Sequence, residues 1–199
     1  MELKILSKRT LLIGAIAGFI FFLTLSLDFI SQNSSAPTIE DTITPSKQEQ
    51  TSAGLPMRLK IPGINVDATV EYVGLTSDGT MNIPESQDNV AWFMLGPHPG
   101  ENGSAVIAGH YGWKDGRASV FDNLYKLRKG DKLYVENDKG VTISFVVRES
   151  RRYDPGADAS NVFNSTDGKA HLNLITCEGV WDKVSKNYSE RLVVFTDRE

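Results

Sequence analysis

The hydrophobic and polar positions divide the chain into three parts. Residues 11–30 form an almost unbroken apolar run, residues 31–55 are rich in Ser, Thr, Gln and Pro, and residues 56–199 alternate between short apolar segments and turn residues. A run of about 20 apolar residues is long enough to cross a bilayer as a helix. The pattern therefore predicts a transmembrane helix, a flexible linker with little to bury, and one folded domain.

Charges on either side of the apolar run predict its orientation. Basic residues precede the run within residues 1–10, whereas acidic residues follow it. Because basic residues favour the cytoplasmic side of a membrane, residues 1–10 are expected in the cytoplasm and the folded domain outside. A cleaved signal peptide is the alternative, with Ser34-Ser35-Ala36 as a small-residue cleavage site, but the run exceeds the usual apolar core of a signal peptide. The favoured interpretation is a single-pass protein of the cell membrane.

Residues 56–199 carry the pattern of a small β domain. Apolar or alternating segments are separated by Gly, Pro, Asn and Asp, which predicts strands bounded by turns. One short helix is predicted at 119–127, where Val120, Leu124 and Leu127 recur at helical spacing. Many short strands with one helix favour a mainly β fold with a closed or nearly closed barrel. The predicted strands cover 57–61, 66–73, 90–93, 104–108, 133–136, 141–148, 171–176 and 191–196.

Composition and charge narrow the classes of function. The 199 residues are 40% hydrophobic with a formal net charge of -4, which supports a packed core and disfavours a nucleic-acid partner. The single cysteine can form neither an internal disulfide nor a cysteine cluster for zinc. Asp154, Asp158 and Asp167 are scattered through a loop-rich stretch, which favours solvated surface over a calcium site. No metal and no cofactor are therefore expected.

Cys177 is the candidate nucleophile, and its neighbours decide between two interpretations. It follows the apolar strand predicted at 171–176, so it is either a buried small hydrophobe or a reactive thiol at a strand end. A reactive thiol needs a base or a cation nearby. His171 lies about 20 Å away on the same strand and is expected to be an exposed strand-end side chain. His98 lies between two prolines in a turn, whereas His110 emerges after a buried run and a glycine and is the best candidate.

The last predicted strand supplies a cation. Arg191 begins this strand, and an antiparallel pairing with 171–176 would bring the start of one strand beside the end of the other. The intervening loop of about 14 residues closes that turn easily. Arg191 would then lie near Cys177, where its guanidinium could donate hydrogen bonds to a developing oxyanion. A solvated charge at a strand end is the alternative interpretation.

These residues carry a resemblance to a known family. Ala108-Gly109-His110, Leu174-Ile175-Thr176-Cys177 and Arg191-Leu192-Val193-Val194 resemble, in order, the three signatures of the sortases, cysteine transpeptidases of Gram-positive bacterial surfaces. The resemblance implies a closed eight-stranded β-barrel with one or two short helices. It implies catalytic roles for His110, Cys177 and Arg191, and a substrate-positioning role for Thr176. Asn173 departs from the family pattern, which most often has Thr there.

The resemblance also implies a reaction and its partners. A sortase cleaves an LPxTG-like sorting signal of an exported protein between Thr and Gly through a thioacyl-enzyme. It then transfers the acyl group to an amine, normally a peptidoglycan precursor, so the protein is anchored to the cell wall. The residues around 119–131 and after Cys177 most resemble class F, with class D or E as alternatives. The sequence offers no candidate for the N-terminal aspartate-plus-aromatic lid of pilin-polymerising sortases.

Two other classes of function remain open at this point. A cysteine hydrolase would use the same side chains but pass the acyl group to water. A non-enzymatic anchored binding module would use Cys177 for packing only. Trp113 and Trp181 are close in sequence to His110 and Cys177, and we expect them to border the site.

Overall fold

The computed structural model describes residues 54–199. The transmembrane helix predicted at 11–30 and almost all of the linker predicted at 31–55 lie outside the described residues. Within the described part of the chain, no helix has the length and apolar character that a membrane span requires.

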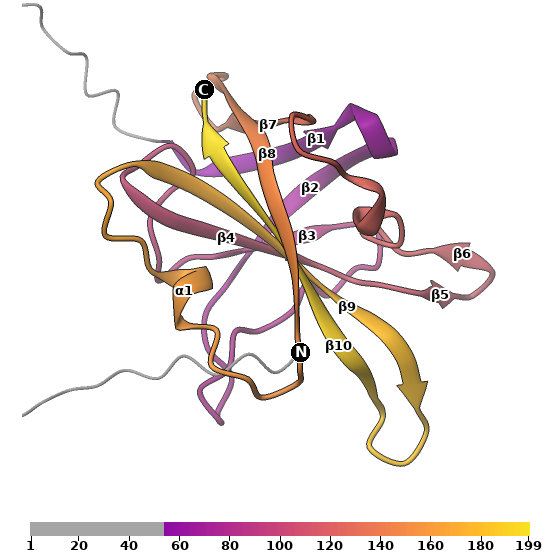
Figure 1. The fold of residues 1–199 in the computed structure, drawn as a ribbon. Helices are drawn as coiled ribbons and strands as arrows, with labels where there is room; N and C mark the ends of the chain where they lie inside the picture. Colours follow the sequence, from indigo (N-terminus) through magenta and orange to yellow (C-terminus); the bar gives the residue numbers. More distant parts are fainter. Residues whose placement is uncertain (1–53) are drawn as a thin grey trace, which may run out of the picture. The chain divides into compact units, whose positions relative to one another are not determined.

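Eight strands form a closed barrel in the order β1-β2-β3-β4-β9-β10-β8-β7 (Figure 1). The predicted mainly β fold and eight-stranded barrel are thereby confirmed. The barrel strands are β1 (Pro56–Ile61), β2 (Val66–Val73), β3 (Val90–Phe93), β4 (Gly103–Gly109), β7 (Lys132–Asn137), β8 (Thr142–Tyr153), β9 (Ala170–Asp182) and β10 (Asn187–Arg198). The smaller elements are the hairpin β5 (Trp113–Lys114) and β6 (Arg117–Ala118), the helix α1 (Ser160–Phe163), and the 3-10 turns η1 (Pro62–Ile64) and η2 (Leu124–Lys126).

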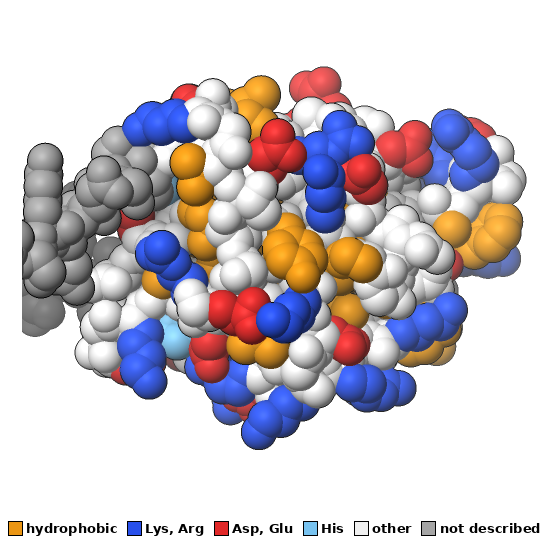
Figure 2. Space-filling model, turned by 90° about the horizontal axis from the view of Figure 1, so that it is seen from above, with side chains coloured by type: hydrophobic (Ala, Val, Ile, Leu, Met, Phe, Trp, Pro, Cys, Tyr) orange, Lys and Arg blue, Asp and Glu red, His pale blue; other side chains and the backbone are white. Residues whose placement is uncertain are grey.

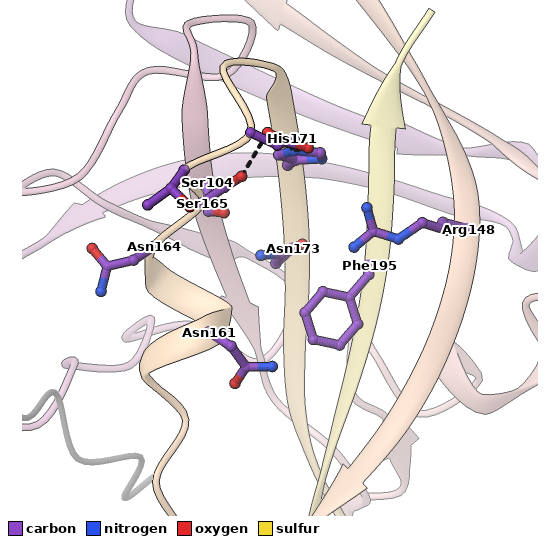
Figure 3. Close-up of a pocket in the computed structure, with 10 residues that line it drawn as sticks. Ser104, Arg148, Asn161, Asn164, Ser165, His171, Asn173 and Phe195 are labelled. Atoms are coloured by element: carbon purple, nitrogen blue, oxygen red, sulfur yellow. Dashed lines mark hydrogen bonds and ion pairs between the residues drawn. The ribbon is translucent and has the colours of Figure 1, made fainter.

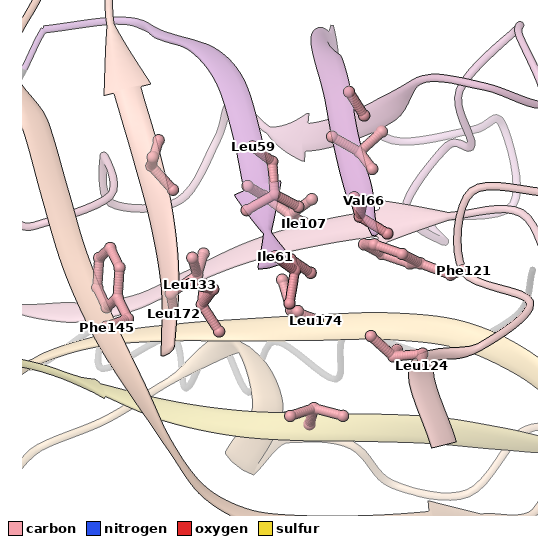
Figure 4. Packing of buried hydrophobic residues seen from close by; sticks show 14 of the residues in the cluster. Leu59, Ile61, Val66, Ile107, Phe121, Leu124, Leu133, Phe145, Leu172 and Leu174 are labelled. Atoms are coloured by element: carbon pink, nitrogen blue, oxygen red, sulfur yellow. The ribbon is translucent and has the colours of Figure 1, made fainter. Parts of the chain in front are cut away.

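Alternating side chains fill the barrel interior. On β9, Leu172 and Leu174 point inward, and on β10 Leu192 and Val194 do the same. Figure 4 shows these strands contributing to one cluster together with β1, β7 and β8. Each fully buried aliphatic or aromatic side chain stabilises the fold by about 1.5–3 kcal/mol relative to an exposed one. The barrel is therefore a packed scaffold whose strand ends are held firmly in place.

The outer face of β3, β4, β9 and β10 is also covered. Outward residues of these strands form a second cluster with Val162 and Phe163 of α1. Phe163 meets Phe93 edge to face at 5.5 Å between ring centroids. Burial on both faces explains why the segment 105–108 is apolar throughout instead of alternating.

On the face seen in Figure 2, basic and acidic side chains are interspersed and do not gather by sign. Ion pairs of this kind in the described domain include Arg58 with Asp67, Lys132 with Glu199, and Arg148 with Asp197. Exposed pairs like these contribute little to stability, so the apolar clusters carry the fold.

The prediction of a helix at 119–127 is wrong. Only Leu124–Lys126 forms a 3-10 turn there, and a helix that the sequence did not suggest lies at Ser160–Phe163. The backbone N–H groups of Val120 and Phe121 bond to Gln87 and His110 rather than within a helix. The apolar spacing at 119–127 reflects packing against the end of the barrel, because Phe121, Leu124 and Leu127 belong to the interior cluster.

The ends predicted for the last two strands are also wrong. The strand predicted at 171–176 continues through Cys177 to Asp182, and a four-residue turn replaces the expected 14-residue loop. A β-bulge allows this extension, because the register shifts between Tyr188 and Glu190. Gly179 has φ +89 at the bulge, a conformation that glycine adopts without strain.

Candidate active site

Register relates the outer faces of five strands. Glu71 of β2 pairs with Ala91 of β3, which pairs with Ala108 of β4. Ala108 pairs with Ile175 of β9, which pairs with Val193 of β10. These five residues form one row across the outer face, so the residues two positions further along the strands form the next row.

The next row holds the three candidate catalytic residues. Arg191 pairs directly with Cys177 across the antiparallel β9–β10 ladder. Continuing the parallel register of β4 and β9 by two residues brings His110 beside Cys177. The sequence-based expectation that Arg191 would lie next to Cys177 therefore agrees with the register, although Cys177 lies within a long strand and not at its end.

His110 is held by its backbone and by its ring. Gly109 lies so close to Phe121 that a Cβ there would overlap the ring. The His110 carbonyl accepts a hydrogen bond from the Phe121 N–H at 3.0 Å. The ring Nε2 lies 2.8 Å from the Pro84 carbonyl oxygen. His110 is thus fixed between two loops at the end of β4.

Cys177 is half-buried and is the free thiol of the chain. Tyr188 lies nearby, and burial together with electrostatic interactions with Cys177 and Asp122 raises the pKa of its phenol. The Tyr188 ring packs edge to face against Tyr111 at 5.1 Å and against Trp181 at 5.0 Å. An aromatic cluster therefore forms around Tyr188 on the hairpin that carries Cys177.

Arg191 is fully buried, and its guanidinium is held by the hairpin. Its Nη1 donates to the carbonyls of Tyr188 at 3.1 Å and Glu190 at 2.9 Å, and its Nη2 donates to Asn187 Oδ1 at 2.6 Å. Its Nε is buried and has no hydrogen-bond partner within the described domain. A buried cation with an unused donor beside Cys177 can stabilise a thiolate or an oxyanion.

In the register, Cys177 lies between Arg191 on one side and His110 on the other. Residues 59–199 match the sortase domain model. The chain belongs to the sortase family. Its fold and family make it a cysteine transpeptidase.

Solved sortase structures resemble this chain. Sortase C-1 from Actinomyces oris is 27% identical, with a TM-score of 0.56, over 71% of this chain and 72% of its own. Sortase C2 of pilus island 1 of Group B Streptococcus is 28% identical, with a TM-score of 0.54 and the same coverage. Sortase C-1 from Streptococcus pneumoniae is 26% identical, with a TM-score of 0.55, over 72% of this chain and 66% of its own. The class F expectation is not confirmed by these similarities.

None of the curated protein sequences compared with this sortase matches it. The catalytic roles of His110, Cys177 and Arg191 and the substrate role of Thr176 therefore stay predictions from the sequence and the family resemblance. What the structure contributes is where each side chain lies and what it contacts.

Thr176 is buried and links two strands. Its hydroxyl donates to the Gly109 carbonyl at 2.8 Å, so it ties the strand of Cys177 to the residue before His110. Sequence reasoning missed this contact, because it joins residues 67 positions apart. The substrate contact predicted for Thr176 would use the same hydroxyl that already donates to the Gly109 carbonyl.

Glu178 follows Cys177 but has its own cation. Arg152 Nε lies 2.6 Å from Glu178 Oε2, and its Nη2 donates to Oε1 at 3.0 Å. This pairing raises the pKa of the Arg152 guanidinium, chiefly through the hydrogen bond from Arg152 to Glu178. The carboxylate of Glu178 is thus paired with Arg152, and no ion pair joins it to Arg191 in residues 54–199.

His171 does not lie at an exposed strand end as the sequence suggested. It is buried, with Nε2 3.0 Å from Asp167 and Nδ1 2.8 Å from Asp197. Burial of the ring is favourable because each ring nitrogen lies within hydrogen-bond distance of a carboxylate. The hydrogen bond from His171, with those from the Lys169 N–H and Ser165, holds the pKa of Asp167 well below its usual range.

A polar recess of about 230 Å³ lies beside this histidine, on the side of β9 that faces α1. Figure 3 shows Asn161 of α1 and Asn164, which follows the helix, on one side, and Arg148 with Phe195 on the other. Asn173 lies between them and donates to the Val162 carbonyl at 2.6 Å. The residue that departs from the family pattern thus anchors α1 to the barrel.

No group of three or more His, Cys, Asp or Glu side chains in residues 54–199 converges as metal ligands would. Trp113 is 72% exposed on β5 and Trp181 is 47% exposed on β9, and their predicted place at the border of the site stays a prediction.

Proposed function

We propose that this sortase cleaves an LPxTG-like sorting signal between Thr and Gly and transfers the acyl group to a cell-wall amine. The observation that supports the proposal most is the pairing of Cys177 with Arg191, whose buried Nε has no hydrogen-bond partner in the described domain. A hydrogen-bond donor that is already positioned beside the thiol can stabilise the negative charge that develops on a substrate oxygen.

The first half-reaction forms a thioacyl-enzyme. The Cys177 thiolate attacks the threonine carbonyl carbon, and the new oxyanion accepts a hydrogen bond from Arg191. The C–N bond to glycine then breaks, and protonated His110 gives its proton to the leaving amine. A thioester on Cys177 and a free glycine amino group result.

The second half-reaction releases the product. An amine, normally from a peptidoglycan precursor, attacks the thioester carbon, and His110 takes the proton that this amine loses. The C–S bond breaks and the Cys177 thiolate returns. The outcome is a new amide bond between the sorted protein and the cell wall.

We further propose that residues 11–30 anchor the enzyme in the cell membrane, with the catalytic domain outside and residues 31–55 as the linker. The order of an apolar run, a polar linker and a folded domain supports this location. A tether of this length keeps the site near substrates at the membrane surface and raises their effective concentration.

The test uses the full chain in nanodiscs, an LPxTG-type peptide and a primary amine, with products identified by mass spectrometry. The proposal predicts cleavage between Thr and Gly and an amide product, both lost in Cys177→Ala. Cleavage that yields only free acid with several amines would instead indicate a hydrolase. Product formation that persists in Cys177→Ala would contradict the proposed nucleophile.

A further inference from the structure

Glu71 lies on the outer face of β2, one row from His110. Its carboxylate accepts hydrogen bonds from the Glu85 N–H at 2.7 Å, the Ser86 N–H at 3.3 Å and Asn89 Nδ2 at 2.8 Å. Asn89 takes the position opposite His110 when the β3–β4 register is continued by one residue. One side chain therefore holds both ends of segment 85–89 against the barrel.

The charge of Glu71 is suited to this role. Burial opposes ionisation of the carboxyl, but hydrogen bonds from the Glu85 N–H, Asn89 and the Ser86 N–H, with the nearby His110, hold its pKa below the usual range. An ionised carboxylate accepts from several donors at once, which a neutral acid or an amide does less well. Glu71 is thus a charged anchor for this segment.

The anchored segment presents an acceptor to His110. Pro84 directly precedes the residues that Glu71 holds, and its carbonyl oxygen lies 2.8 Å from His110 Nε2. A carbonyl oxygen accepts and never donates, so Nε2 must carry the hydrogen in this contact. The other ring nitrogen, Nδ1, is then the one that gains and loses the proton.

We propose that Glu71 is a positioning residue for the transpeptidation: it places the Pro84 carbonyl so that His110 is oriented with Nε2 protonated and Nδ1 exchanging the proton with substrate. The inference rests on the proposed function. It adds which ring nitrogen of His110 exchanges the proton and which residue holds the ring in that orientation. Glu71 acts through Pro84 and touches no reacting atom.

Other groups support the segment without replacing Glu71. Gln87 accepts from the Ser119 hydroxyl at 2.6 Å and from the Val120 N–H at 3.0 Å. Asp88 pairs with Arg117 of β6 at 3.6 Å, and both side chains are largely exposed. These contacts hold the middle of the segment, whereas Glu71 holds both of its ends, including the residues next to Pro84.

The test compares Glu71→Ala and Glu71→Gln with the control Glu136→Gln in the full chain in nanodiscs. Glu136 lies on β7, which does not neighbour β3 or β4, and its carboxylate pairs with Lys60 at 3.4 Å. Nitrogen-15 NMR of a histidine-labelled sample reports the tautomer of each ring, and His110→Gln identifies the His110 signal. Peptide cleavage gives kcat and KM.

We expect a single Nε2–H tautomer of neutral His110 in the wild type and in Glu136→Gln. Glu71→Ala should give a mixture of tautomers and a kcat lowered about tenfold with KM within about twofold, a fraction of what general acid–base catalysis contributes. Glu71→Gln should show both effects more weakly, because the amide oxygen still accepts.

An unchanged tautomer in a folded Glu71→Ala or Glu71→Gln protein would overturn the inference, as would equal loss of kcat in Glu136→Gln. Preserved His98 and His171 signals show that a variant is folded. If the wild type does not turn the peptide over, the proposed function fails, while the tautomer measurement still decides the role of Glu71.

Discussion

At the scale of single residues, Arg152 and Arg191 have opposite surroundings: one is paired with a carboxylate, and the other is held by neutral acceptors. Arg152 is neutralised by Glu178, whereas Arg191 is held by two carbonyls and an amide oxygen and meets no carboxylate among the described residues. Neutral acceptors orient a guanidinium without cancelling its charge. The charge of Arg191 is therefore available for the role proposed for it in the reaction, whereas the charge of Arg152 is paired with Glu178.

Arg191→Lys should lower kcat/KM for peptide cleavage by at least about 10²-fold, the loss expected on removing one oxyanion donor. A lysine has a single ammonium group and cannot reach all three acceptors of the hairpin. Arg152→Lys is the matched control and should stay within a few-fold of the wild type. Comparable losses in both variants would contradict the special role of Arg191.

Thr176→Val tests whether this residue serves the structure or the substrate. The substitution leaves the buried Gly109 carbonyl without the hydroxyl that it accepts from, so unfolding in urea should show a loss of about 1–3 kcal/mol. Thr176→Ser keeps the hydroxyl and should lose less. A higher KM with unchanged stability in Thr176→Val would favour the predicted substrate contact instead.

How far the sequence predicts the site also differs by residue. His110, Cys177 and Arg191 could be singled out as candidates because each lies at a recognisable position after or before a predicted apolar strand, and their roles stay predictions. Glu71, Arg152 and Asn187 could not, since their partners lie on other strands or depend on a bulge that shifts the register. No local pattern marks such contacts.

At the scale of elements, α1 is held in place at both of its ends. Before it, Asp158 accepts from the Ser160 N–H at 2.9 Å; after it, Asp167 joins His171 on β9. A helix of four residues has no stability of its own, so these contacts and the apolar cluster determine its position. Four residues give no periodicity to read, which is why the sequence did not predict it.

The ion pair of Asp167 should make stability depend on pH. Because the folded-state pKa of Asp167 is depressed, its contribution is present above about pH 4 and is lost as pH falls below that value. Asp167→Asn should therefore lower Tm at pH 7, with the difference from the wild type narrowing toward pH 3. Asp88→Asn, in an exposed pair, serves as control. A difference that stays constant with pH would contradict the assignment.

At the scale of the whole molecule, strand pairing in the barrel brings segments that are far apart in sequence to the candidate site. Parallel pairing of β4 with β9 joins residues more than 60 positions apart, and this pairing brings His110 to Cys177. The apolar patterns predicted the barrel and most strands, because alternation and turn residues are local signals. The pairing of strands far apart in sequence came only through the family resemblance, and the structure confirms the fold.

The central claim is that Cys177 carries the acyl group during the reaction. Intact-protein mass spectrometry of the full chain, incubated with an LPxTG-type peptide and no amine, tests it most directly. The proposed mechanism predicts an added mass equal to the peptide acyl portion ending at Thr, located on Cys177 by peptide mapping and released by a primary amine. An adduct on another residue, or one that forms equally in Cys177→Ala, would contradict it.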